Sequence, residues 1–94
     1  MNETQEKIIT ICDAIKDILL YKNQKYGNSA LEPLCIFNKS KIINSIFIRL
    51  DDKLSRIKNC KDEDYKINDL VDIIGYLVLL LTKYDIKDMN KLKD

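Results

Sequence analysis

The chain has 94 residues, of which 46% are hydrophobic and 33% charged, and its net charge is +1. This composition is typical of one small globular domain rather than a disordered chain, and the near-neutral charge argues against direct nucleic-acid binding and against an acidic membrane surface as partner. The chain has no histidine, so Ser-His and Cys-His nucleophile systems are excluded and any catalytic site must use carboxylates, Lys, Arg, Tyr and hydroxyl groups.

The first predicted element is an amphipathic helix over about residues 4–23. The segment KNQKYGNSALEPLCIF follows this helix, and Gly27-Asn28 predicts a turn within it. Pro33 restricts Glu32 to extended geometry or marks the first turn of a short helix, so we expect a structured loop here. The apolar face of the helix recurs at steps of three and four residues, at Ile8, Ile11, Cys12, Ile15, Ile18 and Leu19.

Two further helices are predicted after this loop. The second is capped by Ser40 and ends at about Asn59, and the third runs over about residues 64–84. The polar tail, residues 85–94, frays or adds a last turn. The apolar face of the second helix consists of Ile43, Ile46, Phe47, Leu50, Leu54 and Ile57. In the third helix we expect burial of Leu70, Ile73, Ile74, Leu77, Val78, Leu80 and Leu81.

These elements predict an all-α fold, a small antiparallel helical bundle with three main helices in a single domain over residues 1–94. Helices of about this length with short connections pack in this way. The third helix is apolar over more than half of its circumference, so a three-helix monomer would leave part of that surface in water. We therefore expect a homo-oligomer, a dimer or larger, that completes the core.

Cysteine use and the N-terminus predict a cytoplasmic protein without a membrane span. Cys12, Cys35 and Cys60 are far apart and match no zinc-binding spacing. Their odd number and the lack of a signal-like N-terminus predict free thiols in a reducing compartment. The longest apolar run, residues 73–81, is too short to cross a bilayer.

The bias to Lys, Ile and Asn is typical of an AT-rich genome, such as that of a phage or a low-GC bacterium.

A charged stripe lies beside the apolar face of the second helix. Arg49, Asp52, Lys53 and Arg56 follow the i, i+3, i+4, i+7 spacing of one helix side. Both arginines of this lysine-rich chain lie in the stripe. Arginine has a planar fork that binds phosphate or carboxylate with two N–H groups, whereas lysine is a point charge. The stripe therefore indicates oriented anion recognition or a fixed lattice of ion pairs.

A second polar stripe, with an acidic pair, lies on the third helix. Asp69 and Asp72 are three residues apart, so their carboxylates project from the same side, and Tyr76 and Lys83 extend the stripe. Two carboxylates at this spacing can share one Mg²⁺ or Mn²⁺ with phosphate oxygens and water.

Both stripes also have a purely structural interpretation. Asp52 lies three residues after Arg49 and four before Arg56, so the stripe on the second helix can be satisfied by intrahelical ion pairs. Asp69 and Asp72 can equally form the solvated side of the third helix. The spacing alone leaves both interpretations open.

Three segments occur in a recognisable order over about residues 20–81, namely KNQKYGNSALEPLCIF, IRLDDKLSRIKN and DLVDIIGYLVLLL. Together they resemble the phage and bacterial nucleotide modification associated domain family, which is allied to the MazG-like all-α NTP pyrophosphohydrolases. The resemblance implies an oligomeric helical domain that handles nucleotides. MazG-like enzymes cleave a nucleoside triphosphate between the α and β phosphates, and they hold Mg²⁺ with E-x-x-E and E-x-x-D patterns on two helices.

The match to these acidic patterns is partial. Asp69-x-x-Asp72 matches the second pattern with Asp in place of Glu. The first pattern is not matched, because the residues three positions before and after Asp51 and Asp52 are not acidic. The family's loop has Asn-Pro and an arginine where this chain has Glu32-Pro33 and a cysteine, so Glu32 is either an added ligand or a helix-start acid.

The resemblance implies a role for each residue of the predicted site. The ligands of Mg²⁺ or Mn²⁺ would be Asp52, Asp69 and Asp72. The catalytic residues would be Asp52, Lys53 and Asp72. The contacts to the nucleotide would come from Lys22, Lys25, Tyr26, Arg49, Lys53, Arg56 and Tyr76. Two alternatives stay open, because Lys22 and Lys25 can be solvated surface residues and Tyr26 can fill a core position.

Two functional hypotheses follow. The first is a small Mg²⁺-dependent NTP pyrophosphohydrolase, or a relative of one, that acts on a modified or unmodified nucleotide. The second is a non-catalytic protein that sequesters a signal nucleotide or docks onto a host protein, as small phage-encoded anti-defence factors do. The incomplete acidic set motivates the second hypothesis.

Overall fold

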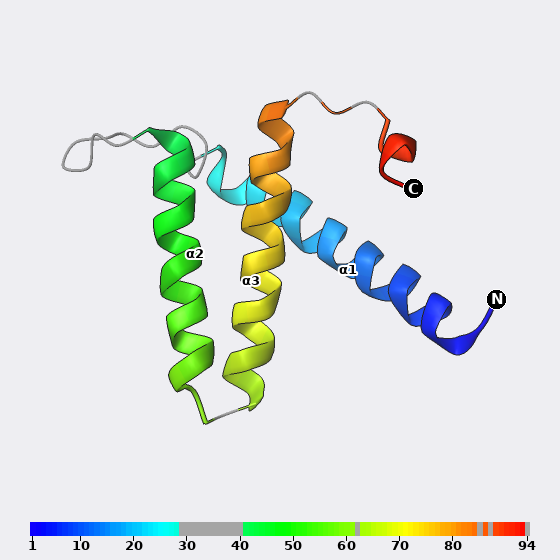
Figure 1. Cartoon of the computed structure of the whole chain (residues 1–94), viewed down its shortest axis with the longest axis horizontal. Coiled ribbons are helices and arrows are strands. Elements are labelled where there is room, and N and C mark those ends of the chain that lie inside the picture. Colours follow the sequence, from blue (N-terminus) through cyan, green and yellow to red (C-terminus); the bar gives the residue numbers. More distant parts are fainter. Residues whose placement is uncertain (29–40, 62, 85, 87, 94) are drawn as a thin grey trace. The chain divides into compact units, whose positions relative to one another are not determined.

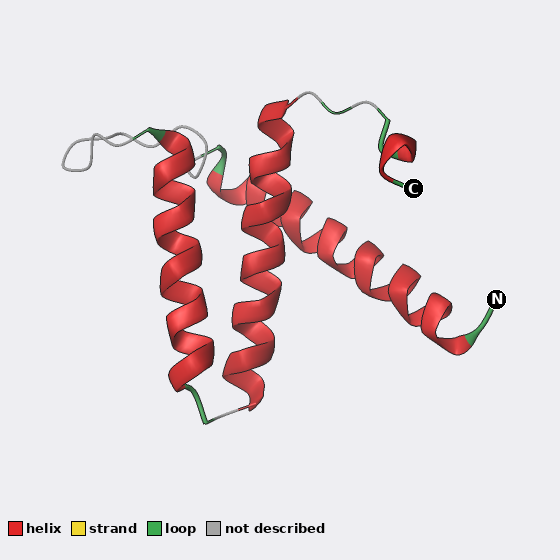
Figure 2. Ribbon diagram, in the orientation of Figure 1, coloured by secondary structure: helices red, strands yellow, loops and turns green. Residues whose placement is uncertain are grey.

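The structure is a computed structural model of the chain, and it describes residues 1–28, 41–61, 63–84, 86 and 88–93. These residues form three α-helices and two short 3-10 helices, with no strand among them (Figure 2). The prediction of an all-α fold is therefore confirmed for this part of the chain. The chain divides into two compact units, Met1–Leu34 and Cys35–Asp94. The single domain over residues 1–94 stays a prediction.

Helix α1, Glu3–Tyr26, begins at a capping box. The Asn2 side-chain oxygen accepts a hydrogen bond from the Gln5 backbone N–H at 2.8 Å, and Gln5 Oε1 accepts one from the Asn2 N–H at 3.0 Å. This reciprocal pair satisfies backbone donors that have no partner within the first turn. Glu3 lies in the first turn, where the helix dipole favours an acid, and it forms an ion pair with Lys7 at 3.1 Å. Local contacts therefore fix the start of α1.

Helix α1 ends at Gly27, where the predicted turn is confirmed. Gly27 has φ 63° and ψ −154°, a conformation that is almost restricted to glycine. Its N–H donates to the Asn23 carbonyl at 2.7 Å, and the Asn23 Nδ2 donates to the Asn28 Oδ1 at 2.8 Å. The helix runs three residues beyond the predicted end, up to this glycine.

The predicted apolar face of α1 is present in sequence but is not buried. No residue of the helix is buried, and only Ile15 and Leu19 are half-buried. Ile8 and Ile11 are more than half exposed. Hydrophobic periodicity thus predicts the helix correctly.

Helices α2, Ile42–Asn59, and α3, Glu63–Leu81, lie side by side and antiparallel (Figure 1). Both bounds agree with the predicted ones to within a few residues. Ser40, the predicted cap of α2, lies outside the described residues, and Lys41 is the N-cap without a side-chain hydrogen bond. Antiparallel pairing is therefore confirmed for these two helices, and a three-helix bundle stays a prediction.

The interface between α2 and α3 has a narrow core. Ile46 is 0% exposed and Leu50 is 8% exposed, and they are the buried apolar side chains of the described residues. Much of the apolar face of each helix stays exposed in this chain by itself, because two packed helices bury only one stripe of each, and burial of the rest in a homo-oligomer stays a prediction. Of the residues in the two predicted apolar faces, the exposed ones are Ile43, Phe47, Leu54, Leu70, Ile74, Leu77, Val78 and Leu81.

Helix α3 ends in a 3-10 turn, Thr82–Tyr84. The Thr82 hydroxyl donates to the Leu79 carbonyl at 2.6 Å and so satisfies a carbonyl near the helix end. A second 3-10 helix, Asn90–Leu92, follows in the tail, for which the sequence left open a frayed end or a last turn. In the described part of the chain, the search for a helix long and apolar enough to cross a membrane finds none.

Candidate functional site

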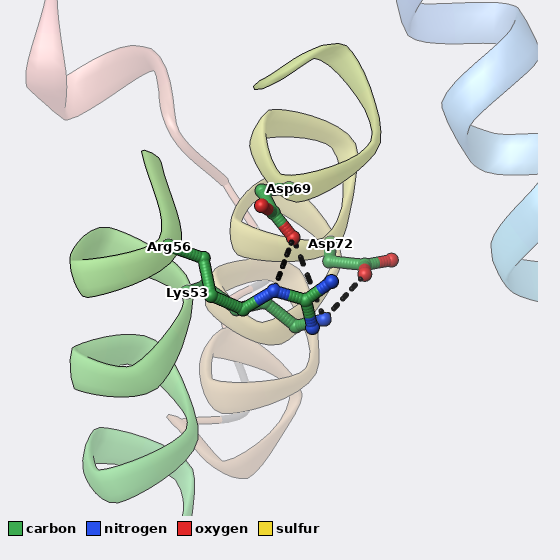
Figure 3. A network of polar contacts seen from close by, with 4 residues as sticks. All are labelled: Lys53, Arg56, Asp69 and Asp72. Atoms are coloured by element: carbon green, nitrogen blue, oxygen red, sulfur yellow. Dashed lines mark ion pairs between the residues drawn. The ribbon is translucent and has the colours of Figure 1, made fainter. Parts of the chain in front are cut away.

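The candidate site is a polar network between α2 and α3 (Figure 3). Lys53 and Arg56 of α2 point at Asp69 and Asp72 of α3. The basic stripe of the second helix and the acidic pair of the third therefore face each other in direct contact. The hypothesis of a ligand site depends on this facing, whereas the ion-pair lattice was predicted within the second helix.

Lys53 bridges the two carboxylates. Its Nζ lies 2.9 Å from Asp72 Oδ2 and 3.7 Å from Asp69 Oδ1. The two carboxylates project from successive turns of α3, and the ammonium lies between them. The Lys53 side chain is only 18% exposed, so its charge interacts with the carboxylates at a lower effective dielectric than a surface pair would.

Asp69 is the most buried charged residue of the described part, at 1% exposed. Its Oδ1 lies 3.6 Å from Arg56 Nε as well as near Lys53. Its Oδ2 is buried and has no hydrogen-bond partner among the described residues. A buried carboxylate oxygen without a donor is unusual in a folded protein. The interpretation of Asp69 as part of a solvated helix side is therefore wrong.

Arg49 and Tyr76 extend the contact between the helices. The Arg49 guanidinium carbon lies 5.8 Å from the centroid of the Tyr76 ring, within cation–π range. Arg49 is exposed and Tyr76 is half-buried. Both were predicted as nucleotide contacts, and the structure brings them together.

The three contacts share one antiparallel register. From Arg49 to Lys53 and on to Arg56, the steps along α2 are four and three residues. The facing residues, Tyr76, Asp72 and Asp69, are spaced by four and three residues in the opposite direction along α3. Arg49, Lys53 and Arg56 of the α2 stripe thus each contact a residue of the α3 stripe at the same level along the helix pair.

Asp52 does not join this network. It is exposed on α2, and it forms no ion pair with Arg49 or Arg56 within the described residues, so the predicted intrahelical lattice around it is not present there. Nowhere among these residues do three or more His, Cys, Asp or Glu side chains gather closely enough to hold a metal ion. Of the three predicted metal ligands, only Asp69 and Asp72 lie together.

Two carboxylates are still a suitable donor set for Mg²⁺ or Mn²⁺. Mg²⁺ in proteins is often held by one or two carboxylates, with phosphate and water completing the shell. The unpartnered Asp69 Oδ2 is an available oxygen acceptor at this position. Asp69 and Asp72 therefore fit a metal that arrives with phosphate, and they fit less well a metal held by protein groups alone.

The other predicted nucleotide contacts lie on α1. Lys25 lies over two aromatic rings of the same helix, with its Nζ 5.9 Å from the Tyr21 centroid and 5.3 Å from the Tyr26 centroid. Tyr26 is 62% exposed, so the interpretation as a core side chain has no support in this unit. Lys22 lies one turn before the helix end and is exposed. The network between α2 and α3 belongs to the other unit. Glu32, Pro33 and Cys35 lie outside the described residues.

Sequence reasoning missed the pairing of individual residues across the two helices. The signal that could have revealed it is the mirrored spacing of the stripes, because residues that face each other in an antiparallel pair must recur at matching steps. It also missed the burial of Asp69. Cys12 is a free thiol, as predicted, and Cys35 lies outside the described residues.

Comparisons with protein-family models, with curated proteins and with solved structures find no match for this chain. The resemblance described above therefore depends on the three sequence segments themselves.

Proposed function

We propose that the α2–α3 pair binds the phosphates and the divalent metal of a nucleotide, as the resemblance to MazG-like pyrophosphohydrolases implies. The observation that carries the proposal is the polar network in which Lys53 and Arg56 meet Asp69 and Asp72 at 2.9–3.7 Å. Cationic side chains and paired carboxylates in one place are the groups that phosphoryl chemistry requires.

The acidic and the basic residues of the network have different proposed roles. Asp69 and Asp72 would hold Mg²⁺ or Mn²⁺, and this metal would polarise the phosphate oxygens that it contacts. Arg49, Lys53 and Arg56 would neutralise the phosphate charge, with the arginines binding oxygens through two N–H groups each. If the chain is an enzyme, water attacks the α-phosphorus of the nucleoside triphosphate, the bond to the bridging oxygen breaks, and the monophosphate and pyrophosphate leave.

A screen of nucleoside triphosphates with Mg²⁺ or Mn²⁺ tests the proposal. We expect binding or turnover of at least one nucleotide, with loss of at least about tenfold in Asp72→Ala, because one of two carboxylate ligands is removed. Asp51→Ala is the matched control, since Asp51 lies on α2 and is exposed. Absence of both binding and turnover for every nucleotide, or equal values for Asp72→Ala and the wild type, contradicts the proposal.

The second candidate function is sequestration of a nucleotide without hydrolysis. The observation that favours it is the charge balance of the network, in which two carboxylates face one ammonium and one guanidinium with no third carboxylate close to them among the described residues. Tight binding with no product, weakened in Arg49→Ala or Arg56→Ala, distinguishes sequestration from catalysis. A host protein as partner would appear as binding that does not depend on these arginines.

We also infer that the functional form is a homo-oligomer. Four apolar side chains of α3 follow helical spacing and are each at least 40% exposed, namely Leu70, Ile74, Leu77 and Leu81. A second α2–α3 pair packed on them would complete a four-helix core. Sedimentation equilibrium should give a dimer or larger, and a monomer at micromolar concentration contradicts this inference.

A further inference from the structure

Among the described residues, the charges of this network balance before any ligand binds. Asp69 and Asp72 carry two negative charges, and Lys53 and Arg56 carry two positive ones. Asp69 is 1% exposed, so water can screen its neighbourhood only weakly. A divalent cation added to this arrangement would leave two uncompensated positive charges in a poorly solvated place.

The Lys53 ammonium also occupies the place that a bridging metal needs. Nζ lies 2.9 Å from Asp72 and 3.7 Å from Asp69, and Mg²⁺ would need oxygens of the same two carboxylates at about 2.0–2.1 Å. An ammonium and a divalent ion cannot both lie between the carboxylates, because they would overlap and repel each other. The protein therefore already holds a cation of its own at this site.

We propose that Lys53 is the resident cation of the Asp69–Asp72 pair, and that a divalent metal binds there only by displacing its ammonium. This inference concerns the order of binding at the proposed nucleotide site, and its second half rests on the proposed function. A free metal ion binds weakly, because it must break the ion pairs of Lys53 without offering the ammonium a new partner. A metal–nucleotide complex binds well, because its phosphate accepts the released ammonium.

The surroundings of Lys53 suit such an exchange. Its four-carbon side chain is flexible, so Nζ can move without a backbone change. Arg49 and Arg56 lie one turn away on either side along the same stripe, and a phosphate that takes the ammonium would lie between both guanidinium groups. On the carboxylate side, the unpartnered Asp69 Oδ2 gives the incoming metal or its bound water an acceptor that Lys53 does not use.

The direct test is Mn²⁺ binding in the absence of nucleotide, measured from the electron paramagnetic resonance signal of free Mn²⁺. We expect Lys53→Met, which keeps the side-chain length and removes the charge, to bind Mn²⁺ at least about tenfold more tightly than the wild type. Lys53→Arg keeps a cation and should bind as weakly as the wild type. Asp72→Asn added to Lys53→Met should abolish the gain, which locates the ion. Equal Mn²⁺ affinities of the wild type and Lys53→Met overturn the proposal.

A measurement on the unmodified protein covers the case in which Lys53→Met does not fold. The side-chain ammonium of a lysine held in an ion pair can be followed by ¹H–¹⁵N NMR. We expect the Lys53 signal to stay unchanged with millimolar Mg²⁺ alone and to shift when Mg²⁺ and the bound nucleotide are both present. A shift of the same size with Mg²⁺ alone overturns the proposal.

The outcomes separate this inference from the proposed function. If Lys53→Met gains Mn²⁺ affinity and no nucleotide binds the wild type, the resident-cation role stands and the nucleotide proposal fails. If nucleotides bind and are lost in Asp72→Ala, yet Mn²⁺ binds the wild type and Lys53→Met equally, the nucleotide proposal stands and the exchange fails.

Discussion

The two units of this chain are stabilised in different ways. In α1, the visible stabilising contacts are local: a capping box at Asn2, an ion pair between residues four apart, and a glycine that ends the helix. In the α2–α3 pair, the contacts that matter join residues distant in sequence, such as Lys53 with Asp72. A helix can thus be specified within one segment, whereas the candidate site exists only where two segments meet.

The largest loss of stability is expected when the core of the α2–α3 pair is disrupted. Ile46→Ala removes a side chain that is 0% exposed, and we expect the free energy of unfolding to fall by about 2–5 kcal/mol. Ile48→Ala, two residues along the same helix and 50% exposed, is the matched control, with a change within about 0.5 kcal/mol. Chemical denaturation followed by circular dichroism measures both. Similar losses in the two variants would mean that the pair does not pack around Ile46.

A smaller effect is expected when the buried carboxylate loses its charge. Asp69→Asn keeps the side-chain shape but removes the attraction to Lys53 and Arg56, so we expect a loss of about 1–3 kcal/mol in the free energy of unfolding. Asp52→Asn, on the exposed side of α2, should change it by less than about 0.5 kcal/mol. A stabilised Asp69→Asn would show that the buried pair costs more than it contributes.

The third change concerns α1 alone, and so it separates the stability of this helix from that of the α2–α3 pair. Gly27→Ala forces a side chain into a conformation with φ 63° and ψ −154°, at a cost of about 1–3 kcal/mol. Among the described residues beyond Gly27 and its chain neighbours, no atom lies within 4 Å of the added Cβ, so the cost comes from the backbone and not from a clash. We expect partial loss of helicity near Tyr26, visible in backbone NMR shifts, with Asp69 and Asp72 unaffected. Equal shift changes at the two aspartates would contradict the local character of this cap.

Much of the fold could be predicted from sequence, because helix formation depends on local pattern. The apolar period of α1, the Gly27 turn and the two charged stripes all follow from spacing within one segment. Asp69 and Asp72 were correctly expected on one side of α3.

The rest depends on how one helix is rotated against the other, and no single segment contains that information. Asp69 becomes buried while Asp72 stays half-exposed, although the two look alike in sequence. Lys53 was expected to meet phosphate, and in the structure it bridges the carboxylates. Asp52 was expected to join the metal ligands, and it lies on the exposed side of α2. The register between the two stripes determines the positions of these side chains, and that register follows from packing around Ile46 and Leu50.

The central claim is that the basic stripe of α2 and the acidic pair of α3 interact directly. A double-mutant cycle on the free energy of unfolding with Lys53→Met and Asp72→Asn tests it, with Lys58→Met and Asp72→Asn as the control, since Lys58 is exposed on the same helix. We predict a coupling of about 0.5–3 kcal/mol for Lys53 with Asp72 and none within error for Lys58. Strictly additive effects for Lys53 and Asp72 would contradict the account.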